Sequence, residues 1–455
     1  MTDTTNTQCG VVGLGYVGLT LAINFDRSGY ETVGYDVDEE KIEDLQEGHD
    51  TTGEYGTEAI RESNISFTTV SESLGQCDYI FISLPTPIDE SKVPDLSGLE
   101  AACETVGQHI SDETVISVES TVYPGATREV LRPAVERGTA AHGGATFSIG
   151  YSPERIVPGG GKRFTEAIKL VSAEDESTLR TLGNVYESIV DAGVHLVETI
   201  ETAEAAKCLE NVQRDVNIGL INEFTIGCRH LDFELDPYAV LEAAGTKWNF
   251  HDYQPGIIGG HCIPIDPHYL RHTFEESGFR PSLIHAARSI NQQMIQHVCS
   301  VTVDALCSAK AVEQLVAGSV EHDSDVRTER TLPENVATSQ VLLLGFGYKP
   351  DVADVRNSGV DDVADGLQNL GLRVNGYDPY HGPESVPESF GFEVLPRLDF
   401  EGVDAIVFLA PHEELRRLDL GIVSDHMNDN PVLVDVERAF DRSTVEAHGF
   451  NYQGL

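Results

Sequence analysis

The most nucleophilic side-chain type in this chain stands in a loop-forming stretch. Residues 259–267 read Gly-Gly-His-Cys-Ile-Pro-Ile-Asp-Pro, and glycines and prolines in that arrangement favour a fixed, non-helical backbone. A cysteine displayed there, Cys262, can attack a carbonyl carbon, and Asp266 can activate water four residues further on. Two alternatives stay open at this point: a buried structural cysteine in a turn, and a metal site formed by His261, Cys262, Asp266 and His268.

A second group of polar side chains falls within a long helical pattern. Lys207 and Asn211 are four residues apart and therefore share one face of a helix. Such a pair, facing a cleft, can donate hydrogen bonds to a developing oxyanion. Arg214 and Asn222 extend roughly the same stripe. The spacing by itself leaves open the alternative of a solvated polar face.

Polar residues also follow two expected strands, at the position where α/β sheets place their sites. Glu154 and Arg155 come after the apolar run at 147–151, and Glu154 can orient water or accept a proton. Residues 119–121, Glu-Ser-Thr, end another apolar run in the same way.

A glycine-rich turn near the start of the chain has the spacing of a dinucleotide site. Gly13, Gly15 and Gly18 stand between an apolar run at 9–12 and an apolar helical pattern. The first glycine permits the tight turn, the second lets a pyrophosphate approach the backbone, and the third packs helix against strand. Asp36, at the end of the next expected strand, would bind ribose hydroxyls and repel a 2′-phosphate. The motif therefore predicts NAD rather than NADP, with a glycine turn that binds nothing as the alternative.

A second glycine turn, Gly345-Phe346-Gly347, follows the apolar run at 341–344. Lys349 and Pro350 replace the rest of the fingerprint. We expect this half to bind another phosphate-bearing ligand with Lys349 as counter-charge, and the alternative is a surface lysine in a degenerate domain.

Both halves of the chain alternate short apolar runs with amphipathic stretches, which is typical of parallel sheets covered by helices. Long helical patterns run from 203 to about 231 and near 281–306. We therefore expect an α/β protein with two Rossmann-like parallel-sheet domains joined by a central long-helix region. The expected segments are 1–200, a central helical domain at 201–310 that holds the cysteine loop, an acidic linker at 311–340, and 341–455.

The charge of the chain is strongly negative, with 75 acidic against 30 basic residues and a net charge of −45. A nucleic-acid partner requires a basic face, so that class is not expected. Self-repulsion of this size is screened at molar salt. We interpret the composition as adaptation to high salt, as in a halophile.

Other features of the composition concern the compartment. No apolar run approaches the length of a membrane span, and residues 1–8 lack the pattern of a signal peptide. The eight cysteines contain no C-x-x-C pair. We expect a cytoplasmic protein with reduced cysteines.

Taken together, these motifs resemble those of the nucleotide-sugar 6-dehydrogenases, a family that includes UDP-glucose, GDP-mannose and UDP-N-acetylhexosamine dehydrogenases. The similarity runs from residue 10 to about 435. Its motifs are GLGYVG at 13–18, LPTP at 84–87, STVYPG at 120–125, YSPER at 151–155, AEAAKCLEN at 203–211 and GYKPDVADVRNS at 347–358.

The resemblance implies a four-electron oxidation with two NAD molecules reduced in turn, an aldehyde captured by Cys262, and a thioester hydrolysed by water. It implies UDP binding by the C-terminal domain, a homodimer formed through the central helix, and no metal. The implied catalytic residues are Cys262, Lys207, Asn211, Asp266, Glu154 and Thr121. The implied NAD contacts are Gly13, Gly15, Tyr16, Val17, Gly18, Asp36, Pro85, Thr86, Thr121 and Arg356. The implied substrate contacts are Glu154, Arg155, Lys207, Asn211, Arg214, Gly259 and Lys349.

Within the family, the cysteine loop favours the branch that acts on UDP-N-acetylated sugars. UDP-glucose and GDP-mannose enzymes usually read GGSC followed by a Pro-Lys-Asp element, whereas this chain has His261 before the cysteine and Ile265 in place of the lysine. The segments at 210–218 and 243–250 are similar to enzymes for UDP-GlcNAc or UDP-GalNAc. Residues 156–159 are more similar to those of UDP-N-acetylmannosamine dehydrogenases, and this activity is therefore the first alternative. UDP-glucose 6-dehydrogenase activity is the second.

Two different classes remain as alternatives. A two-electron 3-hydroxyacid dehydrogenase also pairs a Rossmann domain with a long helix, but it needs neither a cysteine nucleophile nor a second such domain. A non-catalytic NAD-binding module would not need Cys262, Lys207 and Asp266 together. The number of NADH molecules formed per sugar separates the three classes.

Overall fold

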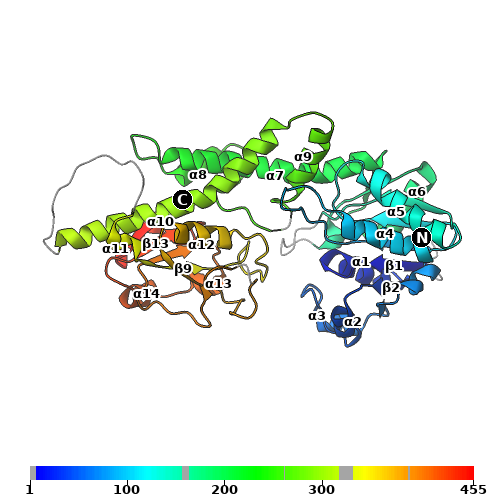
Figure 1. Cartoon of the computed structure of the whole chain (residues 1–455), viewed down its shortest axis with the longest axis horizontal. Helices are drawn as coiled ribbons and strands as arrows, with labels where there is room; N and C mark the ends of the chain where they lie inside the picture. Colours follow the sequence, from blue (N-terminus) through cyan, green and yellow to red (C-terminus); the bar gives the residue numbers. More distant parts are fainter. Residues whose placement is uncertain (1–6, 156–162, 261, 317–331, 388–389) are drawn as a thin grey trace. The chain divides into compact units, whose positions relative to one another are not determined.

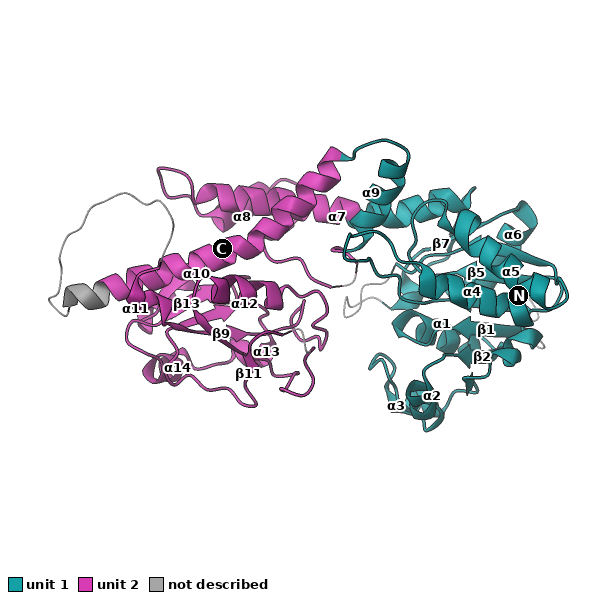
Figure 2. Cartoon of the chain, in the orientation of Figure 1, with its two compact units in different colours: residues 1–211, 265–281 teal, residues 212–264, 282–455 magenta. Residues whose placement is uncertain are grey.

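The computed structural model describes residues 7–155, 163–260, 262–316, 332–387 and 390–455 (Figure 1). The chain divides into two compact units. Unit 1 consists of Met1–Asn211 and Ile265–Pro281, and unit 2 of Val212–Pro264 and Ser282–Leu455 (Figure 2). The predicted central segment is thus shared between the two units, and the division into four segments stays a prediction.

Unit 1 is built on a sheet with strand order β3-β2-β1-β4-β5-β6-β7-β8. Its strands are β1 Gln8–Val12, β2 Glu31–Tyr35, β3 Ser66–Thr68, β4 Tyr79–Ile82, β5 Thr114–Val118, β6 Phe147–Tyr151, β7 Lys169–Ala173 and β8 Val194–Leu196. All neighbours pair in parallel except β6 and β7. The strand order reverses between β1 and β4, and such a switch point is where α/β sheets bind ligands.

The helices of unit 1 follow the strands, as a parallel sheet requires. They are α1 Tyr16–Arg27, α2 Glu39–Gln46, α3 Gly56–Arg61, α4 Ser97–His109, α5 Arg132–Ala141, α6 Glu176–Glu187 and α9 Asp266–Glu276. A long helix, α7 Ile200–Cys228, begins in unit 1 and ends in unit 2.

Unit 2 has an all-parallel sheet with strand order β11-β10-β9-β12-β13-β14. The strands are β9 Gln340–Leu344, β10 Arg373–Tyr377, β11 Glu393–Val394, β12 Ala405–Phe408, β13 Val432–Asp435 and β14 Asn451–Gly454. Its further helices are α8 Pro237–Gly245, α10 Ser282–Val316, α11 Glu334–Ala337, α12 Val360–Asn369, α13 Glu413–Arg416, α14 Leu420–His426 and α15 Arg442–Ala447. The expected pair of Rossmann-like domains with long helices in the middle of the chain is confirmed.

Both faces of the unit 2 sheet are covered, which explains its uninterrupted apolar strands. Val341 and Leu343 of β9 face one core together with Met294 and Val298 of α10. Leu342 faces the other core. Helix α10 therefore serves as one layer of unit 2 (Figure 1).

Two boundaries differ from the sequence expectation. Helix α10 continues to Val316, beyond the expected end at 306 and into the expected linker at 311–340, because the helical period does not stop where the composition turns acidic. Residues 317–331 of that linker lie outside the described residues. Helix α9 begins at Asp266, so the cysteine loop ends one turn earlier than the prolines suggest, with Pro267 in the first helical turn, where it is tolerated. Among the described residues, the structure has no helix with the length and apolar character to cross a membrane.

Candidate active site

The glycine turn between β1 and α1 leaves an open space at one position only. A Cβ on Gly13 would lie 2.2 Å from the Ser83 carbonyl oxygen, and one on Gly18 would lie 1.8 Å from the Gly13 carbonyl oxygen. A Cβ on Gly15, the residue before the helix, would meet nothing within 4 Å. These are the three roles that a dinucleotide fingerprint assigns. The partly exposed Tyr16 and Val17 begin helix α1, whose N-terminus follows this turn.

Asp36, which is predicted to bind the ribose of a dinucleotide, directly follows β2. Its Oδ2 accepts hydrogen bonds from Leu14 N and Lys41 Nζ, both at 2.8 Å, and its Oδ1 accepts from Asp38 N at 3.1 Å. Burial favours the neutral acid, but Lys41 and the backbone N–H groups outweigh it and hold the pKa of Asp36 below its ordinary value. A charged carboxylate beside an open glycine turn fits NAD better than NADP. The sequence analysis did not identify Lys41, although this lysine stands only five residues after Asp36.

The carboxyl ends of β4 and β5 are tied together next to this turn. Thr86 Oγ1 donates to the Thr121 carbonyl oxygen and Leu84 N donates to Ser120 Oγ, both at 2.8 Å. The Tyr269 hydroxyl of α9 donates to the Thr86 carbonyl oxygen. Unit 1 thus brings together the predicted Thr86 and Thr121, while the neighbouring Pro85 is exposed.

Lys207, Asn211 and Asp266 form one buried cluster in unit 1. Their exposed fractions are 7%, 5% and 3%. Asn211 Nδ2 donates to Asp266 Oδ2 at 2.5 Å. Burial raises the pKa of Asp266 to about 6, against the opposing charge of Lys207 and the hydrogen bond from Asn211. At neutral pH this carboxylate is therefore ionised and still basic enough to accept a proton.

Glu204, which the sequence analysis missed, connects α7 to the loop that follows β5. Its carboxylate accepts hydrogen bonds from Gly125 N at 2.6 Å and Thr127 N at 2.9 Å. Burial raises the pKa of Glu204 to about 7. The A-E-x-x-K spacing, with the acid three residues before Lys207 and so on the same side of the helix, was the available signal.

Glu154 is held by a buried lysine that sequence reasoning also missed. Lys169 Nζ lies 2.7 Å from Glu119 Oε2 and 3.3 Å from Glu154 Oε2. Burial opposes the charge of Lys169, but the two carboxylates outweigh it and raise its pKa. Arg155, a predicted substrate contact, pairs with Glu210 at 2.6 Å. Residues 156–159, which lean towards the mannosamine type, lie outside the described residues.

The cysteine loop belongs to unit 2, where it packs on the second glycine turn. A Cβ on Gly259 would lie 2.7 Å from Tyr348 Cβ, and one on Gly260, whose φ is +86°, would lie 3.0 Å from the Tyr348 ring. Cys262 is partly exposed. His261, which the metal alternative requires, lies outside the described residues.

Two cations accompany Cys262 in unit 2. Burial lowers the pKa of Lys349, the charge of Arg214 lowers it further, and the negative charge of a Cys262 thiolate acts in the opposite direction. Lys349 is therefore within electrostatic reach of both Arg214 and Cys262, and the contact of Lys349 and Arg214 with the substrate stays a prediction. Arg356, a predicted cofactor contact, is exposed and forms two hydrogen bonds of 2.9 Å with Asp354. Its contact with NAD stays a prediction.

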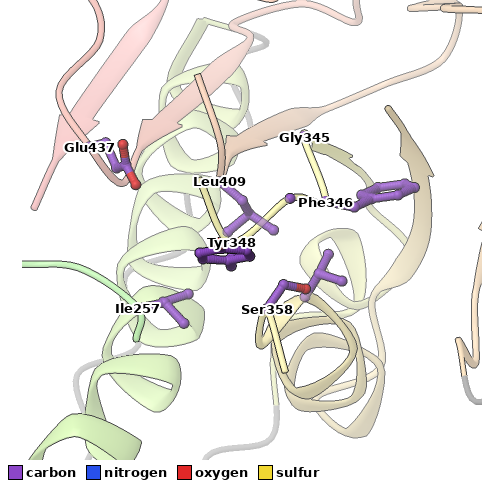
Figure 3. Close-up of a pocket in the computed structure, with 9 residues that line it drawn as sticks. Ile257, Gly345, Phe346, Tyr348, Ser358, Leu409 and Glu437 are labelled. Carbon is purple, nitrogen blue, oxygen red and sulfur yellow. The ribbon is translucent and has the colours of Figure 1, made fainter. Parts of the chain in front are cut away.

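A small cavity of about 20 Å³, partly open to solvent, lies beside the glycine turn of unit 2 (Figure 3). Its lining residues are Ile257, Gly345, Phe346, Gly347, Tyr348, Ser358, Val360, Leu409 and Glu437. Ile257 brings the cysteine loop to the wall of this cavity (Figure 3).

Unit 2 has a carboxylate, Asp378, that corresponds to Asp36 of unit 1, and its hydrogen-bond partners also come from its own unit. Asp378 Oδ2 accepts a hydrogen bond from Phe346 N at 2.6 Å, as Asp36 does from Leu14. The buried His412 lies 3.0 Å from the same oxygen. Asp378 therefore has a buried histidine as its side-chain partner, where Asp36 has Lys41.

Comparison with known proteins agrees with this arrangement. Family models for the NAD binding, central and UDP binding domains of the UDP-glucose/GDP-mannose dehydrogenase family match residues 7–190, 201–293 and 342–442. Protein CapL of Staphylococcus aureus is 38% identical over 90% of this chain and 91% of that protein. The UDP-N-acetyl-D-glucosamine 6-dehydrogenase of Salmonella typhi is 36% identical over 94% of this chain and 96% of that protein. The solved UDP-D-ManNAc dehydrogenase of Pyrococcus horikoshii is 28% identical, with 99% of each chain covered and a TM-score of 0.82. This chain therefore belongs to the UDP-glucose/GDP-mannose dehydrogenase family and is an NAD-dependent nucleotide-sugar dehydrogenase.

Proposed function

We propose that this enzyme oxidises the C6 hydroxyl of a UDP-N-acetylhexosamine to a carboxylate, with Cys262 as the covalent nucleophile and two NAD molecules per sugar. The observation that carries the proposal is the buried Lys207–Asn211–Asp266 cluster, in which Asp266 follows the partly exposed Cys262 by four residues in the chain. A dehydrogenase that stops at the aldehyde needs neither the cysteine nor a basic carboxylate for water.

The electron balance requires two oxidations and one hydrolysis. The primary alcohol loses a hydride to NAD and a proton to solvent, which gives the aldehyde. The Cys262 sulfur adds to the aldehyde carbon, and loss of a second hydride to a second NAD converts the thiohemiacetal into a thioester. Water then adds to the thioester carbonyl, and the carbon–sulfur bond breaks. The sum is alcohol, water and two NAD⁺ converted to carboxylate, two NADH and three protons, with the Cys262 thiol regenerated.

The polar residues of unit 1 suit the charged stages of this sequence. The Lys207 ammonium and the Asn211 amide would donate hydrogen bonds to the oxyanion of the thiohemiacetal and of the hydrolytic intermediate. Asp266, with a pKa of about 6, would accept a proton from the attacking water. Glu154, held by Lys169, and Thr121 are proposed to orient water and substrate.

Unit 2 supplies the chemistry for the UDP part. Lys349 and Arg214 would neutralise the diphosphate. Gly259 allows the loop to lie against Tyr348 without a side chain between them.

The proposed sugar is UDP-GlcNAc or UDP-GalNAc, in line with the Salmonella typhi relative, and UDP-ManNAc is the second candidate because of the Pyrococcus horikoshii structure. A pocket built for an acetamido group leaves its own polar atoms unpaired with UDP-glucose, which costs affinity for that substrate. We expect the best N-acetylated sugar to exceed UDP-glucose by about tenfold or more in kcat/KM. The test is kcat/KM for UDP-glucose, UDP-GlcNAc, UDP-GalNAc and UDP-ManNAc at high salt. UDP-glucose as the best of the four would refute the proposed substrate class.

The nucleophile is tested separately. Cys262→Ala should abolish uronate formation and leave NAD affinity unchanged, because the glycine turn and Asp36 lie in unit 1. Cys307→Ala is the matched control, since Cys307 is the other partly exposed cysteine of the described residues. Uronate formation by the Cys262→Ala variant at the wild-type rate would refute the covalent mechanism.

We further propose a cytoplasmic homodimer with α7 in the interface. Leu209 and Leu220 are 56% and 61% exposed on α7, and eleven residues correspond to about three helical turns, so they lie on one side of the helix. Burying them against a second copy would remove apolar area from water. Leu220→Glu should shift the mass measured by light scattering from dimer to monomer. A wild-type protein that is monomeric at micromolar concentration would refute the dimer.

A further inference from the structure

The loop that carries Cys262 has no regular secondary structure of its own. Residues 256–260 and 262–264 are turns and irregular backbone between α8 and α9. A loop can hold a side chain in a fixed place only when its backbone groups are bonded from outside. Helices α7 and α10, on the unit 2 side, supply such contacts at the two ends of the loop, and Asn357 Nδ2 donates to the Gly260 carbonyl oxygen at 3.4 Å between them.

Asn222 of α7 binds the start of this loop. Its Nδ2 donates to the Gly256 carbonyl oxygen at 3.0 Å, and its Oδ1 accepts from Gly256 N at 2.9 Å. Asn222 is fully buried. Both backbone groups of Gly256 are thus bonded by one rigid side-chain amide.

Arg288 of α10 binds the end of the loop. Its Nη1 donates to the carbonyl oxygen of Ile263, the residue after Cys262, at 3.3 Å. The same nitrogen donates to Asp215 Oδ1 at 2.6 Å. The guanidinium therefore connects the cysteine loop to a fully buried carboxylate on α7.

Asn291 joins these two attachments into one network. Its Oδ1 accepts a hydrogen bond from Asn222 Nδ2 at 3.0 Å, and its Nδ2 donates to Asp215 Oδ1 at 2.8 Å. Asn222, Asn291, Asp215 and Arg288 then form a continuous chain from Gly256 to Ile263, and we call these four residues the loop clamp.

The loop clamp buries polar and charged groups that contribute little to the net stability of the fold. Burial raises the pKa of Asp215 against the opposing effect of Arg288 and Asn291. Its second oxygen, Oδ2, is buried and has no hydrogen-bond partner within the described part of the chain. A buried ion pair with an unsatisfied oxygen contributes less to stability than apolar residues of similar volume would. Stability alone therefore does not account for these polar groups under the loop.

We propose that the loop clamp positions the Cys262 sulfur for attack on the aldehyde, by fixing the backbone on both sides of it. This inference rests on the proposed function, in which Cys262 is the nucleophile. The four residues act through the loop and touch neither substrate nor cofactor in the proposed mechanism, so they are positioning residues.

The test uses Asn222→Ala and Arg288→Lys, with Asn217→Ala as control. Asn217 is an asparagine of the same helix, and its side chain donates only to the Gln213 carbonyl oxygen of that helix, at 2.6 Å. Arg288→Lys keeps the positive charge beside Asp215 and loses only the planar guanidinium. Because the buried carboxylate keeps a cation, this variant is expected to stay folded. The readouts are kcat and KM for uronate formation and the alkylation rate of Cys262 by iodoacetamide, measured by peptide mass spectrometry.

We expect both clamp variants to lower kcat by about tenfold with little change in the KM for NAD, because positioning acts on the reacting geometry. We also expect the alkylation rate of Cys262 to rise by about fivefold or more, since an unfastened loop exposes its thiol more often. The buried Cys208 and Cys299 should stay unmodified, which separates loosening of the loop from global unfolding. Asn217→Ala should behave like the wild type in every measurement.

Unchanged kcat and alkylation in both clamp variants would overturn the inference, and so would a fall in kcat without any change at Cys262. Modification of Cys208 and Cys299 at the same rate as Cys262 would overturn it as well, because it would show a purely structural role. Failure of the proposed function is a separate result: Cys262→Ala would then still form uronate, whatever the clamp variants do.

Discussion

Cofactor choice in unit 1 depends on one carboxylate and the cation beside it. We predict that Asp36 lies beside the position of the 2′-phosphate of NADP, and Lys41 Nζ lies 2.8 Å from its carboxylate. Repulsion between such charges is worth about 1 kcal/mol or more at a partly exposed site. Asp36→Ala removes the repulsion and frees Lys41, so it should narrow the preference for NAD in kcat/KM by about tenfold. Lys41→Met should have the opposite effect, and equal use of NAD and NADP by the wild type would contradict this assignment.

The pKa of Asp266 sets the acidic side of the pH profile. Its carboxylate must be ionised to take a proton from water, and burial places that ionisation at about pH 6. We expect kcat for uronate formation to fall about tenfold per pH unit below this value. Asp266→Asn should lower kcat and remove its decline at acidic pH. If the same decline persists in Asp266→Asn, another group causes it.

Among the candidate site residues, the sequence predicted those pairs that are close along the chain. Lys207 and Asn211 share a helix face because of their spacing, and the structure places Asp266 within hydrogen-bond distance of Asn211 and within electrostatic reach of Lys207. The partners that hold these residues were not predictable in the same way. Lys169 is 15 residues from Glu154 and 50 from Glu119, so only the pairing of β6 with β7 brings them together.

The β1–turn–α1 element offers two matched glycine substitutions. Gly18→Ala places a methyl 1.8 Å from the Gly13 carbonyl oxygen, so it should lower the thermal midpoint and NAD affinity together. Gly15→Ala meets no protein atom within 4 Å, so it should leave the thermal midpoint unchanged and weaken NAD binding alone. Scanning calorimetry and NAD titration of the two variants check this. A large loss of stability in Gly15→Ala would contradict the open cradle.

The strands that the sequence predicted share a continuous apolar character. The expected runs at 9–12, 147–151 and 341–344 fall in β1, β6 and β9. Strand β3 is three residues long and was missed, and β7 was missed because it begins with the charged Lys169. The burial of Lys169 is compensated by an ion pair with a carboxylate from another strand end. The local sequence around Lys169 does not show this partner.

The charge of the whole molecule predicts a requirement for salt. With 75 acidic and 30 basic residues, repulsion between like charges opposes the compact state. Raising KCl from about 0.1 M to 3 M shortens the Debye length from about 10 Å to below about 3 Å. The thermal midpoint should rise throughout this series and rise less in sucrose of equal osmolality, which does not screen charge. A midpoint independent of KCl would contradict the halophilic interpretation.

The molecule as a whole could be predicted as two Rossmann-like halves with long helices, because the two glycine turns and the apolar runs recur. The division into units was not predictable. Cys262 and Asp266 are four residues apart, yet they belong to different units, since the boundary falls between Pro264 and Ile265. Such a boundary depends on which contacts each side makes across the fold, and the sequence run at 259–267 gives no sign of it.

The central claim is a four-electron oxidation at C6, and the stoichiometry of NADH tests it most directly. Limiting UDP-GlcNAc, or the epimer preferred in the substrate panel, is converted to completion with excess NAD at high salt. NADH is measured by absorbance and the sugar products by mass spectrometry. The account predicts two NADH per sugar, uronate as the product and no accumulated aldehyde. One NADH per sugar, with the aldehyde as the final product, would contradict it.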